Sequence, residues 1–233
     1  MINLSDIRLK LDRQSVLKGF DLDAESACVS LVVGPNGAGK SSSLKVACGL
    51  WRPSSGAVLV DGRDITDCPR EYRKYVAYLP QSPSFHPRLT VAQVAEFYAR
   101  IERCSPDEVE YALECFGMDA CSGKRTGNLS GGFRQRLGLA VLSLSKAPVL
   151  LLDEPGLSLD PFWRERLQEW LREEAASGRT LIVATHLLAE WEGKADRCFL
   201  CDDGRIVGQL NPEYLRQAFP APLDQRERKV AND

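Results

Sequence analysis

The sequence predicts an α/β fold that carries an inserted helical segment, and three observations support this. A glycine-rich run, GPNGAGKSSS at 34–43, separates an apolar strand-like run from a segment with helical spacing. Apolar runs typical of buried strands alternate with helical patterns along much of the chain. From about residue 82 to residue 127 this alternation gives way to helical patterns alone. We therefore expect a largely parallel sheet whose connections include a group of inserted helices.

Composition and charge limit the class of protein. The chain has 233 residues, of which 30 are Lys or Arg and 32 are Asp or Glu, so the net charge is −2. This balance gives no overall attraction to nucleic acid or to an anionic membrane. No apolar run approaches the roughly 18–20 residues that would cross a bilayer, and the N-terminus does not resemble a signal peptide. We expect a soluble protein of the cytosol.

The eight cysteines are scattered along the chain, and we interpret them as reduced thiols because a chain of this length does not need disulfides to fold. One close pair, Cys198-x-x-Cys201, lies in the strand-like run RCFLCDDGRIV. A metal or redox role for this pair is the alternative to plain packing. Packing is favoured because the sequence near the pair offers neither a second pair nor a histidine.

The elements before the insert read mainly as strands. INLSDIRLKL and FDLDAESACVSLVV predict short strands, and residues 41–50 after the glycine-rich run predict a helix. SGAVLVDGRDI predicts another strand with a turn at Asp61-Gly62, and YVAYLPQ predicts a strand that ends at Pro80.

The helices of the insert and of the following region carry clear start signals. Thr90 with Gln93 forms a capping-box pattern, and Ser105-Pro106 with Glu108 forms a second, whose helix should end at Gly117. After the insert we expect a helix from 130, a buried strand PVLLLD, a helix from 160 to 178, and a strand RTLIVAT.

The glycine-rich run fits G-x-x-x-x-G-K-[ST], the phosphate-binding loop of P-loop NTPases, in the required strand–loop–helix context. Glycines let successive N–H groups turn toward phosphate oxygens, and the helix that follows adds its positive end. Lys40 would reach the β- and γ-phosphates, and the Ser41 hydroxyl would bind Mg²⁺. A flexible turn is the disfavoured alternative. The predicted phosphate-binding residues are Gly34, Pro35, Asn36, Gly37, Ala38, Gly39, Lys40, Ser41 and Ser42.

Hydrolysis needs a carboxylate for the metal and a group that orients water, and the run VLLLDE at 149–154 supplies both. Four apolar residues followed by acids are typical of a central parallel strand, whose carboxyl end is where α/β folds bind ligands. Asp153 would hold Mg²⁺ through water, and Glu154 would act as the general base or would position the water. Taken alone, this run would be an ordinary strand end, and it is the phosphate loop that favours the functional interpretation.

Together these motifs resemble those of ABC ATPase cassettes. The run LSGGF at 129–133 resembles the signature motif, and it precedes LLLDEP by about 20 residues. Gln81 resembles the Q-loop glutamine, the run SLD at 158–160 resembles the D-loop, and His186 resembles the switch histidine. The resemblance extends over roughly residues 2–210, with all motifs in the family's order.

The resemblance implies a P-loop NTPase (RecA-like) core with an N-terminal antiparallel β subdomain and an inserted α-helical subdomain. Residues 1–215 would form a single cassette, with the helical subdomain at about 82–147 and a polar tail at 216–233. ATP and Mg²⁺ would be the cofactors, and Gln81 would contact the metal and the attacking water. His186 would contact the γ-phosphate.

The resemblance also implies a dimer, most simply a homodimer, in which two cassettes close head to tail around two ATP molecules. Ser130, Gly131 and Gly132 would contact ATP held by the other protomer, and Ser158 and Asp160 of the D-loop would touch that protomer. Asp160 also precedes Pro161, so it is a good N-cap in its own right.

The chain departs from the family pattern at three positions. Leu11 stands where an aromatic residue usually stacks on adenine, Phe133 where Gln is common in the signature, and Gly156 where Thr is common. The first departure removes a stacking contact, so we expect weaker nucleotide affinity or looser base selectivity. None removes a phosphate donor or a metal ligand, and we expect catalysis to be retained.

The leading functional hypothesis is the ATP-hydrolysing subunit of a membrane transporter, held on the cytoplasmic face of the membrane by separate integral membrane permease subunits. Phe85, His86 and the helix at 91–101 would border the groove that receives the permease, although plain packing is an equal alternative for each. Because the chain continues for only about 50 residues after His186, it resembles exporter cassettes more than importers. One alternative is a non-transport ABC ATPase acting on the ribosome or DNA, which is disfavoured because such relatives resemble fused or coiled-coil-split cassettes, whereas this sequence reads as one uninterrupted cassette without a basic patch, so no nucleic-acid partner is expected. The other is an inactive nucleotide-binding scaffold, which is disfavoured because Glu154 and His186 are present.

Overall fold

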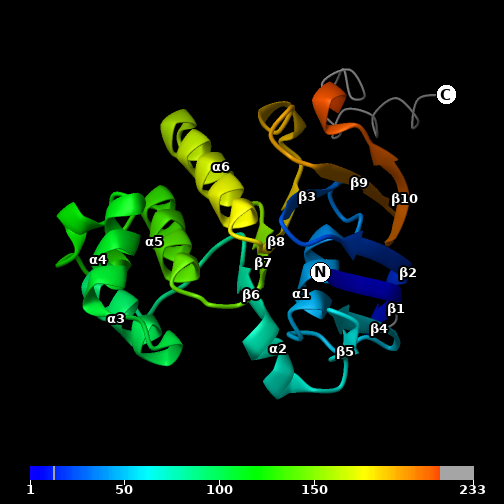
Figure 1. Cartoon of the computed structure of the whole chain (residues 1–233), viewed down its shortest axis with the longest axis horizontal. Helices are drawn as coiled ribbons and strands as arrows, with labels where there is room; N and C mark the ends of the chain where they lie inside the picture. Colours follow the sequence, from blue (N-terminus) through cyan, green and yellow to red (C-terminus); the bar gives the residue numbers. More distant parts are fainter. Residues whose placement is uncertain (13, 216–233) are drawn as a thin grey trace.

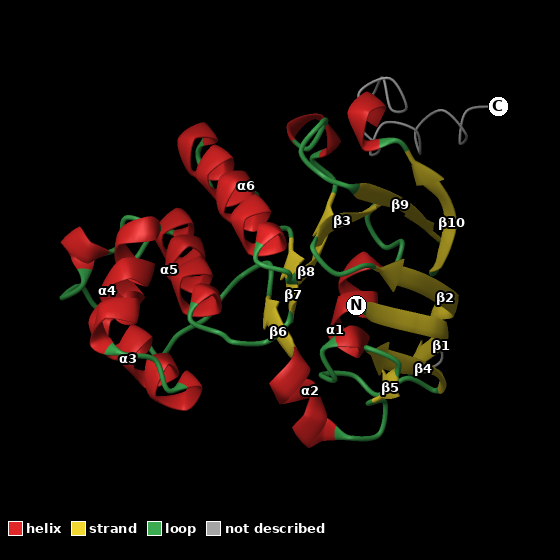
Figure 2. Cartoon of the chain, viewed as in Figure 1, coloured by secondary structure: helices red, strands yellow, loops and turns green. Residues whose placement is uncertain are grey.

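A computed structural model describes residues 1–12 and 14–215. Two sheets and a group of helices organise this part of the chain (Figures 1 and 2). The predicted polar tail at 216–233 lies outside the described residues. The described part confirms the α/β fold class, with an antiparallel sheet, a mainly parallel sheet and a helical group inserted between two neighbouring strands of the mainly parallel sheet.

The smaller sheet is antiparallel and has the strand order β2-β1-β4-β5. Its strands are β1 (Ile2–Leu11), β2 (Gln14–Ala24), β4 (Ser55–Val60) and β5 (Arg63–Asp64). The prediction of short strands at the N-terminus was wrong, because β1 and β2 run for 10 and 11 residues. Irregularities in their pairing, between Leu4 and Ile7 for example, interrupt the alternation that a long regular strand would show.

The larger sheet has the strand order β10-β9-β3-β8-β7-β6. Its strands are β3 (Cys28–Val33), β6 (Val76–Leu79), β7 (Val149–Asp153), β8 (Thr180–Thr185), β9 (Arg197–Asp202) and β10 (Arg205–Leu210). All neighbours are parallel except β9 and β10, which form an antiparallel hairpin. The run RCFLCDDGRIV is therefore two strands joined by a turn, with Asp203 and Gly204 both at positive φ.

The helices are α1 (Lys40–Ala47), α2 (Pro69–Tyr75), α3 (Val91–Glu102), α4 (Pro106–Cys115), α5 (Gly131–Ser143) and α6 (Pro161–Ala176). Helices α3, α4 and α5 pack on one another, and Figure 1 shows them on the side of the larger sheet that faces away from the antiparallel sheet. The predicted capping boxes are confirmed, since Thr90 accepts from the Gln93 amide and Ser105 from the Glu108 amide. Helix α2 was not foreseen.

The larger sheet separates two hydrophobic cores. Leu31 and Leu150 face the core shared with α3, α5 and α6, whereas Val32 and Leu151 face the core shared with α1 and the antiparallel sheet. Neighbouring residues of one strand thus point to opposite faces, and both faces are covered, as the continuous apolar runs predicted. The carboxyl ends of β3, β7 and β8 therefore meet at one edge of a buried and rigid sheet.

Candidate nucleotide-binding site

The phosphate loop lies between the end of β3 and the start of α1. Gly39 precedes α1 with φ of 106°, in the left-handed region that favours glycine. Gly34 is required for a different reason, because a Cβ there would lie 2.0 Å from the Cys201 carbonyl oxygen. The loop is thus pressed against the β9–β10 hairpin, an approach that only glycine allows.

A cavity of about 490 Å³ opens over this loop and gathers most of the predicted site. Its predicted lining residues are Asn36, Gly37, Gly39, Lys40, Ser41, Ser42, Gln81, Glu154 and His186. Gly34, Pro35 and Ala38 belong to the loop without lining this cavity. Residues from four separate parts of the sequence therefore meet where the sequence predicted a nucleotide.

Lys40 is bent back over its own loop. Lys40 is only 6% exposed, and its Nζ donates to the carbonyl oxygens of Gly34 at 2.8 Å and Pro35 at 3.0 Å. These contacts hold the ammonium beside the cavity that Lys40 lines. A fixed charge of this kind needs little reorganisation when an anion binds.

Asp153 ends β7 and faces the phosphate loop. Its Oδ1 accepts from the Ser41 hydroxyl at 2.9 Å and its Oδ2 from the Tyr78 hydroxyl at 3.2 Å. Burial raises the pKa of the Asp153 carboxyl, and the two hydrogen bonds offset part of that shift. Burial, with the nearby Asp153 charge, also raises the pKa of the Tyr78 hydroxyl. The contact of Tyr78 with Asp153 was not predicted, because Tyr78 looks like an ordinary half-buried strand residue in the sequence.

The Ser41 and Asp153 pair suits Mg²⁺, which prefers oxygen ligands, keeps several waters and uses substrate phosphates as further ligands. No group of three or more His, Cys, Asp or Glu side chains in the described chain could hold a metal by itself. Cys198 and Cys201 are free, buried thiols that belong to the two different cores. Their placement agrees with packing in place of metal binding.

Glu154 and His186 are in direct contact. The His186 Nδ1 lies 2.7 Å from Glu154 Oε1, and the His186 amide donates to Oε2 at 3.4 Å. Glu154 adopts φ of 48°, and its own amide donates to the Ala184 carbonyl at 2.8 Å. This uncommon backbone conformation at the end of β7 turns the carboxylate toward the end of β8 and over the cavity.

The signature and D-loop residues lie together at the start of two helices. Ser130 accepts from the Phe133 amide at 3.4 Å and caps α5, while Asp160 accepts from the Trp163 amide at 3.1 Å and caps α6, as predicted. A Cβ on Gly132 would lie 2.9 Å from the Ser158 carbonyl oxygen, so the two segments are in close contact.

None of the predicted signature and D-loop residues lines the chain's own nucleotide cavity. Ser130 and Gly131 are exposed, so the signature end of α5 is open to solvent. Contact with a nucleotide in a second protomer therefore stays a prediction for Ser130, Gly131 and Gly132.

Two residues that the sequence did not single out also line the nucleotide cavity, Val16 from β2 and Leu157 from the segment after β7. Leu11, at the predicted adenine position, is 37% exposed and lies outside this set. Val16 follows Leu11 by five positions in the sequence, but nothing local marks it, because its place depends on how β2 packs against the phosphate loop.

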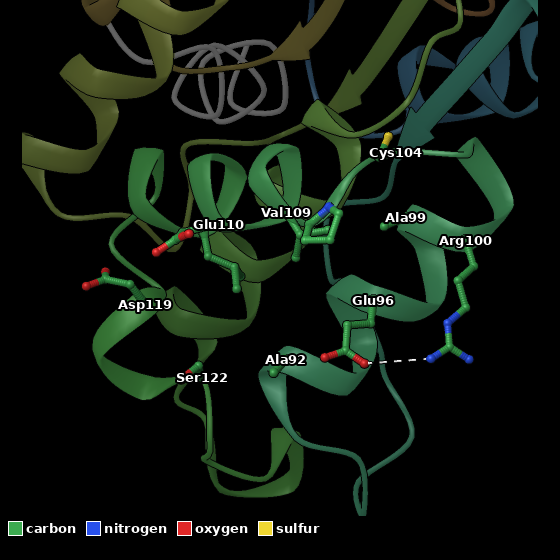
Figure 3. Close-up of a pocket in the computed structure, with 11 residues that line it drawn as sticks. Ala92, Glu96, Ala99, Arg100, Cys104, Val109, Glu110, Asp119 and Ser122 are labelled. Carbon is green, nitrogen blue, oxygen red and sulfur yellow. Dashed lines mark ion pairs between the residues drawn. The ribbon is translucent and has the colours of Figure 1, made fainter.

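A second cavity, of about 540 Å³, lies between α3 and α4 (Figure 3). Glu96 and Arg100 form an ion pair at 4.0 Å on one wall, and Glu110 and Asp119 lie on the other. No residue of the predicted nucleotide site lines this cavity, although part of its wall comes from the helix at 91–101 that was predicted to border the permease groove. The phosphate-loop cavity is therefore the one at which the predicted chemistry gathers.

The sheet order, the phosphate loop and the ordered motifs define an ATP-binding cassette of the P-loop class. Residues 17–156 match the family model described as "ABC transporter". The chain therefore belongs to the ABC transporter family, as an ATP-binding cassette. A shorter stretch, residues 127–190, also matches a model described as "AAA domain, putative AbiEii toxin, Type IV TA system".

Relatives and solved structures agree with this assignment. The chain is 34% identical over 83% of its length to the "Uncharacterized ABC transporter ATP-binding protein YxlF" of Bacillus subtilis, covering 64% of that protein. It is 33% identical over 84% of its length to the "Retinal-specific phospholipid-transporting ATPase ABCA4" of Homo sapiens, covering only 9% of it. It is 29% identical over 93% of its length to the "Nod factor export ATP-binding protein I" of Burkholderia pseudomallei, covering 73% of it. The chain thus spans less than two thirds of the first two of these relatives.

Two solved structures share the fold over nearly the whole chain. One, described as "Structure of ATP binding subunit of ABC transporter", has a TM-score of 0.84 at 27% identity and covers 100% of both chains. The other is a dimeric ATP-binding cassette in a post-hydrolysis state bound to ADP and Pi, with a TM-score of 0.80 at 25% identity, covering 91% of this chain and 99% of that one. In the described residues of our chain, no helix is long and apolar enough to cross a membrane.

Proposed function

We propose that this chain is the ATP-hydrolysing subunit of a multi-subunit membrane exporter, in which ATP-driven closure of two cassettes moves separate permease subunits. The observation that carries the proposal is the single cavity in which the phosphate loop, Gln81, Glu154 and His186 meet. An inactive scaffold would not need the last three residues beside the phosphate loop.

In the proposed reaction, a water oxygen forms a bond to the γ-phosphorus and the bond from that phosphorus to the ADP oxygen breaks. Glu154 accepts the proton of the attacking water, and Lys40 and the loop amides bind the phosphates. Ser41 and Asp153 would hold Mg²⁺, which when bound would neutralise phosphate charge. His186, positioned by Glu154 in the present structure, would contact the γ-phosphate, and Gln81 would position the water.

We further propose that two copies of the chain assemble head to tail. The exposed signature end of α5 supports this. A helix N-terminus with Ser130 and two glycines can bind an anion, and these residues do not line the nucleotide cavity of their own chain, so the anion would come from a second copy. Dimerisation is also supported by the solved ATP-binding cassette bound to ADP and Pi, which is described as dimeric. D-loop residues Ser158 and Asp160 would then contact the second copy.

The exposed apolar side chains of α3 support a permease partner. Phe97 is 57% exposed and Ile101 is 60% exposed, and these two positions lie one turn apart on the helix. Large apolar side chains gathered on one helix face are typical of an interaction surface. With such a partner the cassette would lie on the cytoplasmic face of the cell membrane, and the relatives named for export favour outward transport.

Replacing Glu154 with Gln tests the proposed base. The amide keeps the size of the side chain but cannot accept the proton, so we expect ATP hydrolysis to fall by about 10²–10⁴ while ATP binding is retained. Turnover measured by phosphate release, with binding measured by calorimetry, separates the two effects. Glu165→Gln, an exposed change on α6, is the matched control. Normal turnover by Glu154→Gln would refute the assignment.

The alternative of a non-transport ATPase is tested through the partner. We expect the full chain to co-purify with an integral membrane protein from detergent extracts, and we expect Phe97→Ser with Ile101→Ser to weaken that association. Co-purification with ribosomes or DNA would replace the transport proposal while leaving the ATPase assignment intact.

A further inference from the structure

The phosphate loop is held from behind by the β9–β10 hairpin. The Ala38 carbonyl oxygen accepts two hydrogen bonds from this hairpin, one from the Gly204 amide at 2.8 Å and one from the Cys201 thiol at 3.1 Å. The contact is close elsewhere too, because a Cβ on Gly39 would lie 3.3 Å from the Gly204 Cα. The hairpin is more than 160 residues away in the sequence, so this support is a tertiary contact and not part of the loop motif.

The hairpin is itself anchored to the antiparallel sheet. The Lys18 amide donates to the Gly204 carbonyl at 3.0 Å, and the Arg205 Nε donates to the Lys18 carbonyl at 2.9 Å. The Lys18 Nζ also pairs with Asp203 at 2.5 Å. The turn therefore has fixed partners on both sides, and it can restrain the loop without moving with it.

The planarity of the peptide bond gives this restraint a direction. The Ala38 carbonyl and the Gly39 N–H belong to the same trans peptide unit, so they point to opposite sides. Holding the carbonyl oxygen against the hairpin turns the Gly39 N–H away from it. Gly39 lines the nucleotide cavity, and its amide is one of the groups that would bind phosphate.

We propose that Cys201 is a positioning residue for nucleotide binding: its thiol and the Gly204 amide together hold the Ala38–Gly39 peptide in the orientation that phosphate requires. Cys201 touches no substrate atom and acts through the loop. The inference rests on the proposed nucleotide site. Cys201 is fully buried, and burial raises the pKa of its thiol to about 12, so the neutral S–H that donates to Ala38 is the form present.

The same strand supplies a matched control. Cys198 is 1% exposed, and burial raises the pKa of its thiol to about 12 as well. It faces the core on the opposite side of the sheet, with Leu31 and Leu181, whereas Cys201 faces the core beneath the loop, with Ala38 and Leu44. Truncation of either cysteine removes the same buried atoms, but only one truncation removes the contact to the loop.

The test compares Cys201→Ala, Cys201→Ser and Cys198→Ala in the full chain, with KM and kcat for ATP hydrolysis and with ATP affinity by calorimetry. A thiol is a weak donor, so loss of its bond should let other loop conformations compete and raise the KM for ATP about two- to fivefold, with kcat unchanged. Ser keeps a donor at this position, so we expect it to restore the native KM. Cys198→Ala should lower the unfolding midpoint and leave KM at the native value.

Three results would overturn the proposal: an unchanged KM in Cys201→Ala, an equal rise in Cys198→Ala, or no recovery in Cys201→Ser. If Cys201→Ala does not fold, the test uses the native protein: the alkylation rates of the Cys201 and Cys198 thiols are measured by mass spectrometry with and without ATP. Stronger protection of Cys201 than of Cys198 by ATP supports the proposal, and equal protection refutes it. A native chain that binds no ATP would refute the proposed nucleotide site itself. Failure of the Cys201 role gives a different result, because the native chain would then still bind ATP.

Discussion

Arg136 on α5 makes the contacts that join the signature helix to the D-loop helix, and its replacement by Met should destabilise the protein. The guanidinium carbon lies 4.4 Å from the ring centroid of Phe133 and 4.1 Å from that of Trp163. One of its nitrogens also donates to the Gly117 carbonyl oxygen. Phe133 is on α5 and Trp163 is on α6, so one cation lies between aromatic rings of both helices.

The size of the effect follows from these contacts. A cation–π contact contributes about 0.5–1 kcal/mol when exposed and about 2 kcal/mol when desolvated, so two half-buried contacts contribute about 1–3 kcal/mol. A hydrogen bond from a charged donor contributes about 1.5–3 kcal/mol. Burial opposes both, since desolvation lowers the pKa of Arg136 and the buried Nε has no hydrogen-bond partner in the described chain. Because such terms do not add fully, we expect a net loss of about 2–3 kcal/mol.

The assay is the free energy of unfolding from urea denaturation, followed by circular dichroism, for native protein, Arg136→Met and Arg134→Met. Met keeps most of the aliphatic length of Arg, so the difference in unfolding free energy reflects loss of the guanidinium contacts and not the creation of a cavity. Arg134 is exposed two residues earlier on the same helix, and its change should stay within about 0.5 kcal/mol of native. A loss for Arg136→Met no larger than that of the control would refute the reasoning.

Two further predictions concern the nucleotide site. Asp153→Asn should stabilise the protein at pH 7 and abolish ATP hydrolysis. The folded state raises the pKa of Asp153, so its carboxylate destabilises the native state above that pKa, and this penalty disappears as the pH falls below the carboxyl's unfolded pKa. The stability gain should therefore shrink between pH 7 and pH 4 in urea titrations, and a gain that stays constant would contradict the cause given. Leu11→Tyr should raise ATP affinity at least about fivefold if an aromatic residue there stacks on adenine. Calorimetry should show no such gain for tripolyphosphate, which has no base, and an unchanged ATP affinity would place adenine elsewhere.

Features set by near neighbours in the sequence could be predicted. The caps at Thr90, Ser105, Ser130 and Asp160 each involve a residue and an amide three positions later, so the local sequence contains all of the information. The gathering of the phosphate loop with Glu154 could also be predicted, because parallel strands bring their carboxyl ends to one edge. Helix α2 was missed because seven residues give too few turns for a periodic pattern.

Features set by long-range packing could not be predicted. The turn between β9 and β10 is an exception, because Asp203-Gly204 is the same kind of turn signal as Asp61-Gly62, although we predicted the run RCFLCDDGRIV as a single strand-like segment. Tyr78 and Val16 look like ordinary strand residues, yet one donates to Asp153 and the other lines the nucleotide cavity. Their roles depend on which strands are neighbours, and residue type along the chain does not contain that order.

The distribution of buried charge links the fold to the site. Among the described side chains, the buried charged residues are Lys40, Asp153 and Glu154, all of them in or beside the nucleotide site. Burying a charge is unfavourable unless partners compensate, and here the compensation comes from carbonyls, a hydroxyl pair and a histidine that the two sheets hold in place. The rest of the described core is apolar or neutral, so it can stabilise a site whose charges oppose folding. Replacing any of the three charges by a neutral residue of similar shape should therefore affect ATP hydrolysis far more than it affects folding.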